Sequence, residues 1–254
     1  MSSIIKISAK SQRLTTNTSG YRNWLIETKE VSIIPSHSAV LLCDIWDKHW
    51  CRGAFERVSN LISRIISTVN IARALGILIV HAPSGTMKYY DNHPARKRVS
   101  SVQKECDLIE KYIESPIHPL ESTDSSDTVR DFAIDGTSCW TQQHPAIKID
   151  NDIDVISDNG LELIKFFKHK KIDTILIGGF HTNKCILDRS FGIKQLVRWG
   201  LSVYLLRDLT DCMYNPAQAP YVSHAEGLQL SINYIEQFWC QSILGRDLIN
   251  RKHQ

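Results

Sequence analysis

The stretch from Ile175 to Cys185 constrains the fold of this 254-residue chain more than any other part of the sequence. It reads ILIGGFHTNKC, which is an apolar run, two glycines, a short polar turn and a cysteine, and an amphipathic run begins at Ile186. This pattern predicts a buried strand that passes directly into a helix. Cys185 then lies in the first turn of that helix, where unpaired backbone N–H groups and the helix dipole favour a thiolate. A thiolate can attack a carbonyl carbon, although most lone cysteines are ordinary buried residues.

The same alternation of strand and helix recurs along the chain. Continuous apolar runs, which are typical of parallel strands buried on both faces, occupy 39–43, 77–80, 146–149, 174–177 and 203–206. Helical spacing of apolar residues occupies 54–74, 161–170, 185–200 and 221–239. The alternation predicts an α/β fold, a doubly wound three-layer sandwich around a central, mostly parallel sheet of five or six strands.

Two segments depart from this alternation. Residues 1–35 are expected to form an N-terminal extension with one or two short strands, and residues 36–254 to form the main domain. Within that domain, residues 82–145 are an insertion with helical spacing only around 102–113, and long insertions often carry function. Its aromatic residues could cover a site and its basic residues could hold an anion; they are Tyr89, Tyr90, Trp140, Arg96, Lys97 and Arg98. The alternative is a peripheral elaboration used in oligomer contacts.

Composition narrows the class of protein. The net charge of +3, without a basic block, gives no reason to expect nucleic acid or an anionic membrane as partner. Seven scattered cysteines without a CxxC pair indicate reduced thiols, and neither a signal peptide nor an apolar run long enough for a membrane span is visible. We therefore expect a cytoplasmic protein that acts on a small-molecule substrate and forms a homo-oligomer.

Several reactive side chains occur where the predicted strands end. Asp44 and His81 directly follow two of the strands, Cys185 follows a third, and Lys148 lies within or beside another. Ligands of open α/β sheets bind outside the carboxyl ends of the strands. The sequence therefore predicts that these four side chains converge on one edge of the sheet.

Asp44, Lys148 and the GGFHTNKC turn that ends at Cys185, in this order and spacing, resemble the isochorismatase-like cysteine hydrolase superfamily. That group includes nicotinamidases and N-carbamoyl amidohydrolases. The resemblance runs from about residue 38 to 239, with the 82–145 insertion as its largest departure. DIWDKHWC at 44–51 and RDLTD at 207–211 look closest to a little-characterised branch of the superfamily.

The resemblance implies a role for each of these residues. Cys185 would attack an amide or ureide carbonyl and form a thioester, with Asp44 as the general base and acid. Lys148 would be the electrostatic partner that keeps Asp44 ionised and favours the thiolate. A cis peptide between Phe180 and His181 would aim backbone N–H groups, including that of Cys185, at the developing oxyanion. The identity of the substrate is not encoded in these motifs.

Further residues are predicted to contact the substrate, and the metal question stays open. The predicted substrate contacts are Trp46, His49, Trp50, Trp140 and His181. The resemblance requires no cofactor, but nicotinamidases carry zinc on an Asp-x-His pair and a second histidine. Here Asp47, His49 and His81 could form such a set, although the Asp-x-His pair follows the first strand rather than the second. His49 could instead face the substrate.

Two other functions remain possible at this level. One is a metal-assisted or isochorismatase-type hydrolase with the same fold, against which Cys185 argues. The other is a non-catalytic binding module, which the presence of Asp44, Lys148 and Cys185 makes less favoured.

Overall fold

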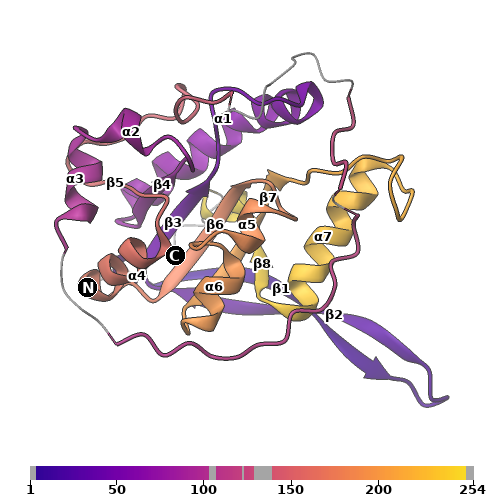
Figure 1. Ribbon diagram of the computed structural model, residues 1–254. Coiled ribbons are helices and arrows are strands. Elements are labelled where there is room, and N and C mark those ends of the chain that lie inside the picture. The colour runs from indigo at the N-terminus through magenta and orange to yellow at the C-terminus, as the bar shows by residue number, and fades with distance from the viewer. Residues whose placement is uncertain (1–3, 103–106, 122, 129–138, 250–254) are drawn as a thin grey trace.

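An eight-stranded sheet forms the centre of the protein in the computed structural model, which describes residues 4–102, 107–121, 123–128 and 139–249 (Figure 1). The order of the strands is β2-β1-β8-β7-β6-β3-β4-β5. Their bounds are Ile5–Thr16 (β1), Arg22–Ile33 (β2), Ser38–Cys43 (β3), Leu78–Ala82 (β4), Val155–Ile156 (β5), Thr174–Phe180 (β6), Ser202–Asp211 (β7) and Gln241–Ile243 (β8). Strands β3 to β8 pair in parallel, and β1 and β2 add an antiparallel edge. The prediction of five or six strands was therefore too small.

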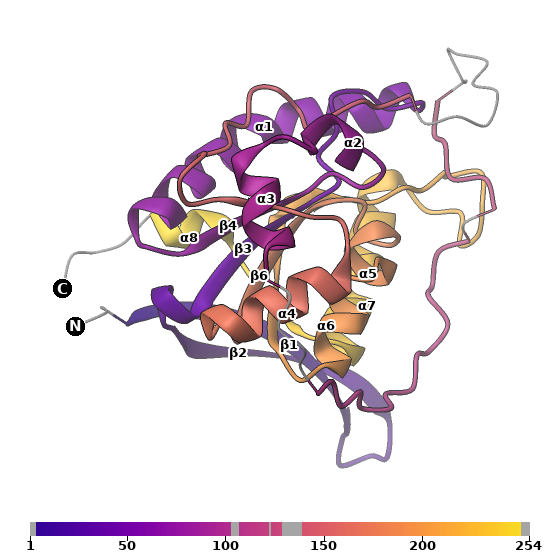
Figure 2. The same cartoon turned by 60° about the vertical axis from the view of Figure 1, so that its left-hand side comes forward.

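Helices cover both faces of the sheet, as expected for a three-layer sandwich (Figure 2). Helices α1 (Arg52–Ala74) and α8 (Gly245–Ile249) pack on one face. Helices α4 (Gly160–Lys170), α6 (Ile193–Arg198) and α7 (His224–Phe238) pack on the other, with the short α5 (Cys185–Asp188). A 3-10 turn, η1 (Pro35–His37), precedes β3, and α2 (Met87–Tyr90) and α3 (Pro94–Ser100) lie in the insertion.

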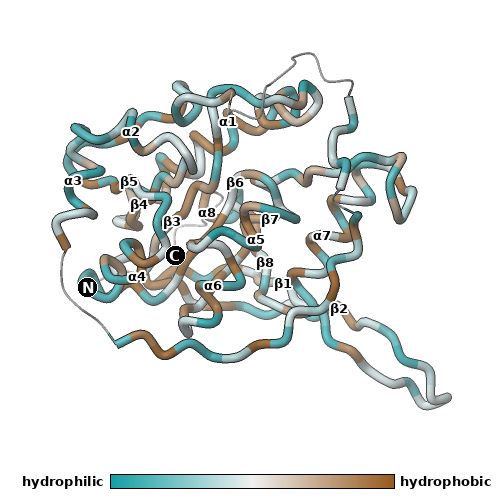
Figure 3. Tube along the Cα trace, viewed as in Figure 1, coloured by the Kyte–Doolittle hydropathy of each residue, from teal (hydrophilic) through white to brown (hydrophobic). Residues whose placement is uncertain are grey.

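The central pair of strands, β3 and β6, explains why the sheet is buried on both faces. All six residues of β3 are buried, and so are all residues of β6 after Thr174. Their side chains alternate between the two hydrophobic clusters on either side of the sheet, and the hydrophobic colouring gathers on these strands in Figure 3. Both strands end at the same edge because Cys43 is in register with Gly179. This register brings the residue after β3 close to the turn after β6.

The N-terminal extension is a long hairpin rather than one or two short strands. Strands β1 and β2 have 12 residues each and pair along their whole length. At the base of the hairpin Ile5, Ile7 and Ile33 are buried, whereas the tip projects beyond the body of the protein (Figure 1). Apolar residues are confined to one face only at the base, which is why the sequence indicated short strands.

Three predicted elements are wrong. Residues 146–149 form a loop, and the strand that pairs with β4 is β5, some residues later. The carbonyl of Lys148 accepts a bond from the Arg73 guanidinium instead of joining a ladder. Residues 107–113 are not helical, and 103–106 lie outside the described residues. The helix predicted over 185–200 is divided into α5 and α6, with a break before Gly192, where an added Cβ would lie 2.8 Å from the Ile186 carbonyl oxygen.

Part of the insertion forms an extended strap over the surface. Residues 107–121 run along α4, α6 and α7 (Figure 2). The Lys168 Nζ donates to the carbonyl of Asp107, and the Tyr234 hydroxyl donates to the carbonyl of Pro116. This part of the insertion therefore lies on the surface of the protein, and its use in oligomer contacts stays a prediction. Among the described helices, none is long and apolar enough to cross a membrane.

Candidate active site

Asp44 directly follows β3 and is held in an unusual backbone conformation. Its φ is +49°, in the left-handed region that few non-glycine residues adopt, and its side chain is buried. One carboxylate oxygen, Oδ1, accepts the backbone N–H of Ser84 at 2.7 Å. The other, Oδ2, accepts Nε of Arg189 at 3.0 Å. Both oxygens therefore have a donor that favours the ionised form.

Cys185 begins α5 next to this carboxylate. The thiol hydrogen-bonds to Asp44, and a backbone N–H of His181 is directed at the sulfur. Helix α5 ends after four residues, and Arg189 leaves it with extended dihedral angles (φ −60°, ψ 155°). The early end of the helix allows the Arg189 side chain to return to Asp44. The result is a buried carboxylate that contacts both a half-buried thiol and a partly exposed guanidinium.

The electrostatics of this group differ from the expected thiolate. Burial and the negative charge of Asp44 raise the pKa of the Cys185 thiol to about 12, and Arg189 opposes this shift. Burial also raises the pKa of the Asp44 carboxyl, against Arg189 and the hydrogen bonds from Ser84. At neutral pH the resting pair is therefore a thiol that faces a carboxylate. A helix of four residues has too weak a dipole to convert the Cys185 thiol to a thiolate.

Lys148 is not brought to this group. Its side chain is exposed and lines a surface hollow of about 260 Å³ with Tyr89, Tyr90 and His93. Among the described residues, Arg189 is the cation that contacts Asp44. The expectation that Lys148 neighbours Asp44 is thus wrong, because the chain around it turns outward instead of forming a strand. Arg189 and Ser84 were missed, and the spacing of four residues between Cys185 and Arg189 was the available signal.

Two histidines beside Cys185 form a chain of defined tautomers. The peptide bond between Phe180 and His181 is cis. The backbone N–H of Cys51 donates to Nδ1 of His49, so a neutral His49 carries its proton on Nε2. That Nε2 lies 3.2 Å from Nε2 of His181, which must accept and therefore carries its own proton on Nδ1. Burial lowers the pKa of His49 to about 4 and that of His181 well below its ordinary value, so both rings are neutral at pH 7. The Nδ1 of His181 is buried without a hydrogen-bond partner among the described residues.

Two tryptophans close the site. The rings of Trp46 and Trp140 are stacked with centroids 3.9 Å apart, and Trp50 stacks on His49 at 5.3 Å. Asp47 fixes the segment that carries Trp140, since its carboxylate accepts from the backbone N–H and the hydroxyl of Thr141. The remaining cavity of about 10 Å³, room for about one water, is lined by Asp44, Trp46, Lys48, His49, Phe55, Val58, Phe180 and His181. The end of the insertion therefore lies beside Asp44, whereas Tyr90 lines the outer hollow.

Two of the three basic residues of the insertion bind other parts of the protein. Arg96 makes a two-pronged ion pair with Glu162, and Arg98 donates to the carbonyls of Asn151 and Asp154. Lys97 is exposed on α3. These contacts fasten the insertion to the body of the protein and leave no support for an anion site over Cys185.

The residues considered for zinc do not come together. His81 lies within β4 and is fully buried, with Nδ1 2.8 Å from Gln143 Oε1 and Nε2 3.0 Å from Asp154 Oδ2. The Asp47 carboxylate accepts a hydrogen bond from the Thr141 hydroxyl, and His49 contacts His181 instead of a metal. The Asp47, His49 and His81 set therefore does not fit a metal.

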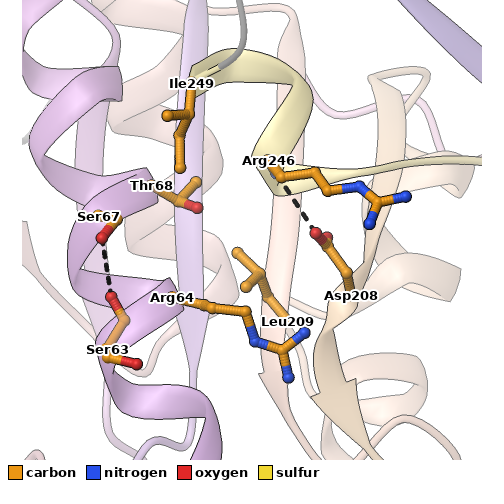
Figure 4. A pocket seen from close by; sticks show the side chains of 8 residues that line it. All are labelled: Ser63, Arg64, Ser67, Thr68, Asp208, Leu209, Arg246 and Ile249. Carbon is orange, nitrogen blue, oxygen red and sulfur yellow. Dashed lines mark hydrogen bonds between the residues drawn. The ribbon is translucent and has the colours of Figure 1, made fainter.

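A further surface hollow lies away from these residues. It measures about 170 Å³ and is formed by α1, α8 and the chain near the end of β7 (Figure 4). Its acidic residue, Asp208, accepts hydrogen bonds from the backbone N–H groups of Gly245 and Arg246, and so caps the N-terminus of α8. None of the residues predicted for catalysis lines it.

Comparison of the whole fold with solved structures identifies its class. The protein is similar to a cysteine hydrolase from Pseudomonas syringae pv. phaseolicola 1448A, with a TM-score of 0.53 and 19% sequence identity over 85% of this chain and 92% of that one. The fold is isochorismatase-like. A second solved structure, assigned as an isochorismatase from Burkholderia xenovorans LB400, agrees with a TM-score of 0.51 and 16% identity over 84% of this chain and 86% of that one. No protein-family model matches the sequence, and no curated protein matches it either. The isochorismatase-like fold predicted from the sequence is thus confirmed.

Proposed function

We propose that the protein is a cysteine hydrolase that cleaves the C–N bond of a small amide or ureide through a thioester on Cys185. The observation that carries the proposal is the buried contact of a cysteine thiol with a carboxylate that is itself held by Arg189. A thiol with a raised pKa needs an adjacent base to become a nucleophile, and Asp44 is that base.

The first half of the reaction transfers one proton. As the Cys185 sulfur attacks the carbonyl carbon, the Asp44 carboxylate takes the thiol proton. The tetrahedral intermediate collapses when Asp44 returns this proton to the leaving nitrogen, which releases ammonia or an amine and leaves a thioester. The guanidinium of Arg189 stabilises the carboxylate before and after this exchange, in the role that the resemblance assigned to Lys148.

The second half regenerates the enzyme. Asp44, again ionised, takes a proton from water, and the resulting hydroxide attacks the thioester carbonyl. Collapse of this second intermediate expels the Cys185 sulfur, which recovers the proton from Asp44. Backbone N–H groups at the start of α5 are the proposed donors to the oxyanion in both halves.

The substrate class is supported by unpartnered donors near Asp44. Nε1 of Trp140 and Nδ1 of His181 are both buried without a hydrogen-bond partner among the described residues. Buried polar atoms normally have partners, so a ligand that supplies acceptor oxygens would satisfy them. Amides and ureides that carry a second carbonyl or a carboxylate fit this requirement. Because Trp140 closes the site, its segment must move to admit such a substrate.

Release of ammonia from a panel of amides and ureides tests the proposal. We expect Cys185→Ala and Asp44→Asn to abolish turnover on any substrate that the wild type cleaves. Cys240→Ser is the matched control, because burial also raises the pKa of that thiol to about 12 but it lies elsewhere, against the α7 side of the core. Undiminished ammonia release by Cys185→Ala would refute the mechanism. Hydrolysis of a vinyl ether that survives the same substitution would favour the isochorismatase-type alternative.

A further inference from the structure

A second group of reactive side chains lies where β7 ends and α7 begins. Asp211 is the last residue of β7, Cys212 follows it, and His224 is the first residue of α7. The Cys212 sulfur lies 3.7 Å from His224 Nε2, and the same nitrogen lies 3.0 Å from Asp211 Oδ1. Asp211 and Cys212 are buried and His224 is half-buried. Among the described residues this is the one group of at least three such side chains whose ligand atoms all lie within 4.8 Å of one another.

The surroundings of His224 require a positive charge at this group. Its Nδ1 lies 3.2 Å from the carbonyl oxygen of Tyr214, and its Nε2 lies 3.0 Å from the carboxylate of Asp211. Asp211 is ion-paired with Arg57, so its carboxylate can only accept. A neutral imidazole carries only one N–H, so next to this carboxylate one of its nitrogens would present a lone pair to an oxygen lone pair. Either the ring carries a second proton, or a cation lies between Nε2 and Oδ1. The thiol of Cys212, on the same side of the ring, offers a third donor atom to such a cation.

We propose that Asp211 Oδ1, Cys212 Sγ and His224 Nε2 bind a divalent transition metal of the zinc type. With ordinary zinc–ligand lengths, tetrahedral ligand atoms lie about 3.3–3.6 Å apart. The distances of 3.0 and 3.7 Å from His224 Nε2 bracket this range, and the third pair of ligand atoms, from Asp211 and Cys212, lies within 4.8 Å. A water or another small ligand would occupy the fourth position.

The groups around these ligands match those of metal sites. A metal-bound histidine usually donates its other N–H to a carbonyl or carboxylate, and here Nδ1 faces the Tyr214 carbonyl. The second oxygen of Asp211 accepts Nε of Arg57 at 2.8 Å, which orients the carboxylate and leaves Oδ1 for the metal. Arg57 also pairs with Asp127. A divalent metal and Arg57 together balance the charges of two carboxylates and one thiolate.

Binding would exchange protons for the metal. Burial and Asp211 raise the pKa of the Cys212 thiol, so without a metal the sulfur keeps its proton. Formation of the metal–sulfur bond releases that proton to solvent, together with the Nε2 proton of His224 where it is present. The metal would tie the end of β7 to the start of α7, and no step of the proposed hydrolysis passes through it.

Metal content of the full-length chain tests this inference. The protein is stripped with chelator under reducing conditions, loaded with zinc or cobalt chloride and desalted. We expect about one equivalent of zinc per chain, and with cobalt a thiolate-to-metal charge-transfer band in the near ultraviolet. Cys212→Ser and His224→Gln should each lose the bound equivalent and the band, while their circular dichroism stays that of the wild type. Asp211→Asn, which keeps the side-chain shape, provides a third variant should either of these fail to fold.

Two controls separate this site from other thiols. Cys240→Ser and Cys185→Ser should both retain the metal. Loss of the metal in Cys185→Ser with retention in Cys212→Ser would move the site to the active-site thiol and overturn the inference. A wild-type chain that retains no zinc or cobalt after loading and desalting would also overturn it.

Discussion

Arg189 Nε lies 3.0 Å from Asp44 Oδ2, so the cation that binds the proposed base comes from the same turn as the proposed nucleophile, Cys185. Cys185 begins this turn and Arg189 ends it. The cation expected from a distant part of the sequence, Lys148, is exposed on the surface. Substitution of Arg189 and of Lys148 can therefore show which of the two cations acts on Asp44: Arg189, as the structure indicates, or Lys148, as the resemblance implies.

Arg189→Ala should lower kcat/KM by about 10- to 100-fold, because a charge-assisted hydrogen bond to a buried carboxylate contributes roughly 1.5–3 kcal/mol. Lys148→Ala should change kcat/KM by less than about twofold. Steady-state kinetics on the same substrate measures both. The reverse order of effects would restore Lys148 as the electrostatic partner.

The pH profile of kcat/KM should have an acid limb set by Asp44. Burial raises the pKa of this carboxyl and the reaction needs the carboxylate, so activity falls as the pH drops through a value above the ordinary 3.9 of an aspartic acid. Arg189 opposes this shift, so Arg189→Ala should move the limb to higher pH. Ionisation of Cys185, with a pKa of about 12, should add no alkaline limb below about pH 11. A limb that stays in place in Arg189→Ala would contradict the assignment.

Acid should destabilise the protein partly through His49. Burial lowers its pKa in the folded protein to about 4, against about 6.5 in the unfolded chain. The folded state therefore binds fewer protons, so this contribution to stability is fully present above about pH 6.5 and is lost as the pH falls toward 4. After allowance for the half-buried position of the ring, His49→Gln should remove about 1–2 kcal/mol of the fall in unfolding free energy between pH 7 and 4.5.

Urea unfolding at the two pH values measures this difference. His169→Gln is the control, because that histidine is exposed on α4. Equal acid sensitivity of the wild type and His49→Gln would show that His49 does not stay neutral in the folded protein.

Gly179→Ala should prevent normal folding. The residue has φ +120°, and an added Cβ would lie 2.0 Å from the Cys43 carbonyl oxygen, so β3 and β6 could not keep their spacing. We expect a loss of more than about 4 kcal/mol, which exceeds most single substitutions. Gly76→Ala is matched in sign of φ (+79°) but has no atom within 4 Å of the added Cβ, and should cost about 1 kcal/mol. Similar thermal unfolding of the two variants would contradict the close approach of β3 and β6.

The parts of the fold that the sequence predicts correctly are those with a local signal. Strand β3 is a continuous apolar run, α1 has apolar residues at helical spacing, Asp44 directly follows β3, and Cys185 follows the short turn after β6. The hairpin was underestimated because most of its length is exposed on both faces, so that neither face of β2 shows apolar alternation.

The incorrect prediction that Lys148 neighbours Asp44 has a different cause. Residues 146–149 have the composition of a strand, but Arg73 and Asp154 form an ion pair at 2.6 Å and bind the neighbouring backbone, so the chain loops before β5. The end of α5 at Asp188 likewise depends on packing around Gly192, and only this break lets Arg189 reach Asp44. A contact between distant segments decided the first outcome. The second depends on a close backbone approach within residues 186–192, which the spacing of apolar residues does not reveal.

The shared turn of Cys185 and Arg189 also affects how this protein could diverge. Because the proposed nucleophile and its cation share one turn, changes in the cover formed by the end of the insertion need not remove either group. Among the described residues, the insertion reaches Asp44 at its start, where the Asp44 backbone N–H donates to the Ala82 carbonyl and the Ser84 backbone N–H donates to the Asp44 carboxylate. If the proposed function is correct, substitutions farther along the insertion, near Trp140, are therefore expected to change substrate preference while Asp44, Cys185 and Arg189 stay in place.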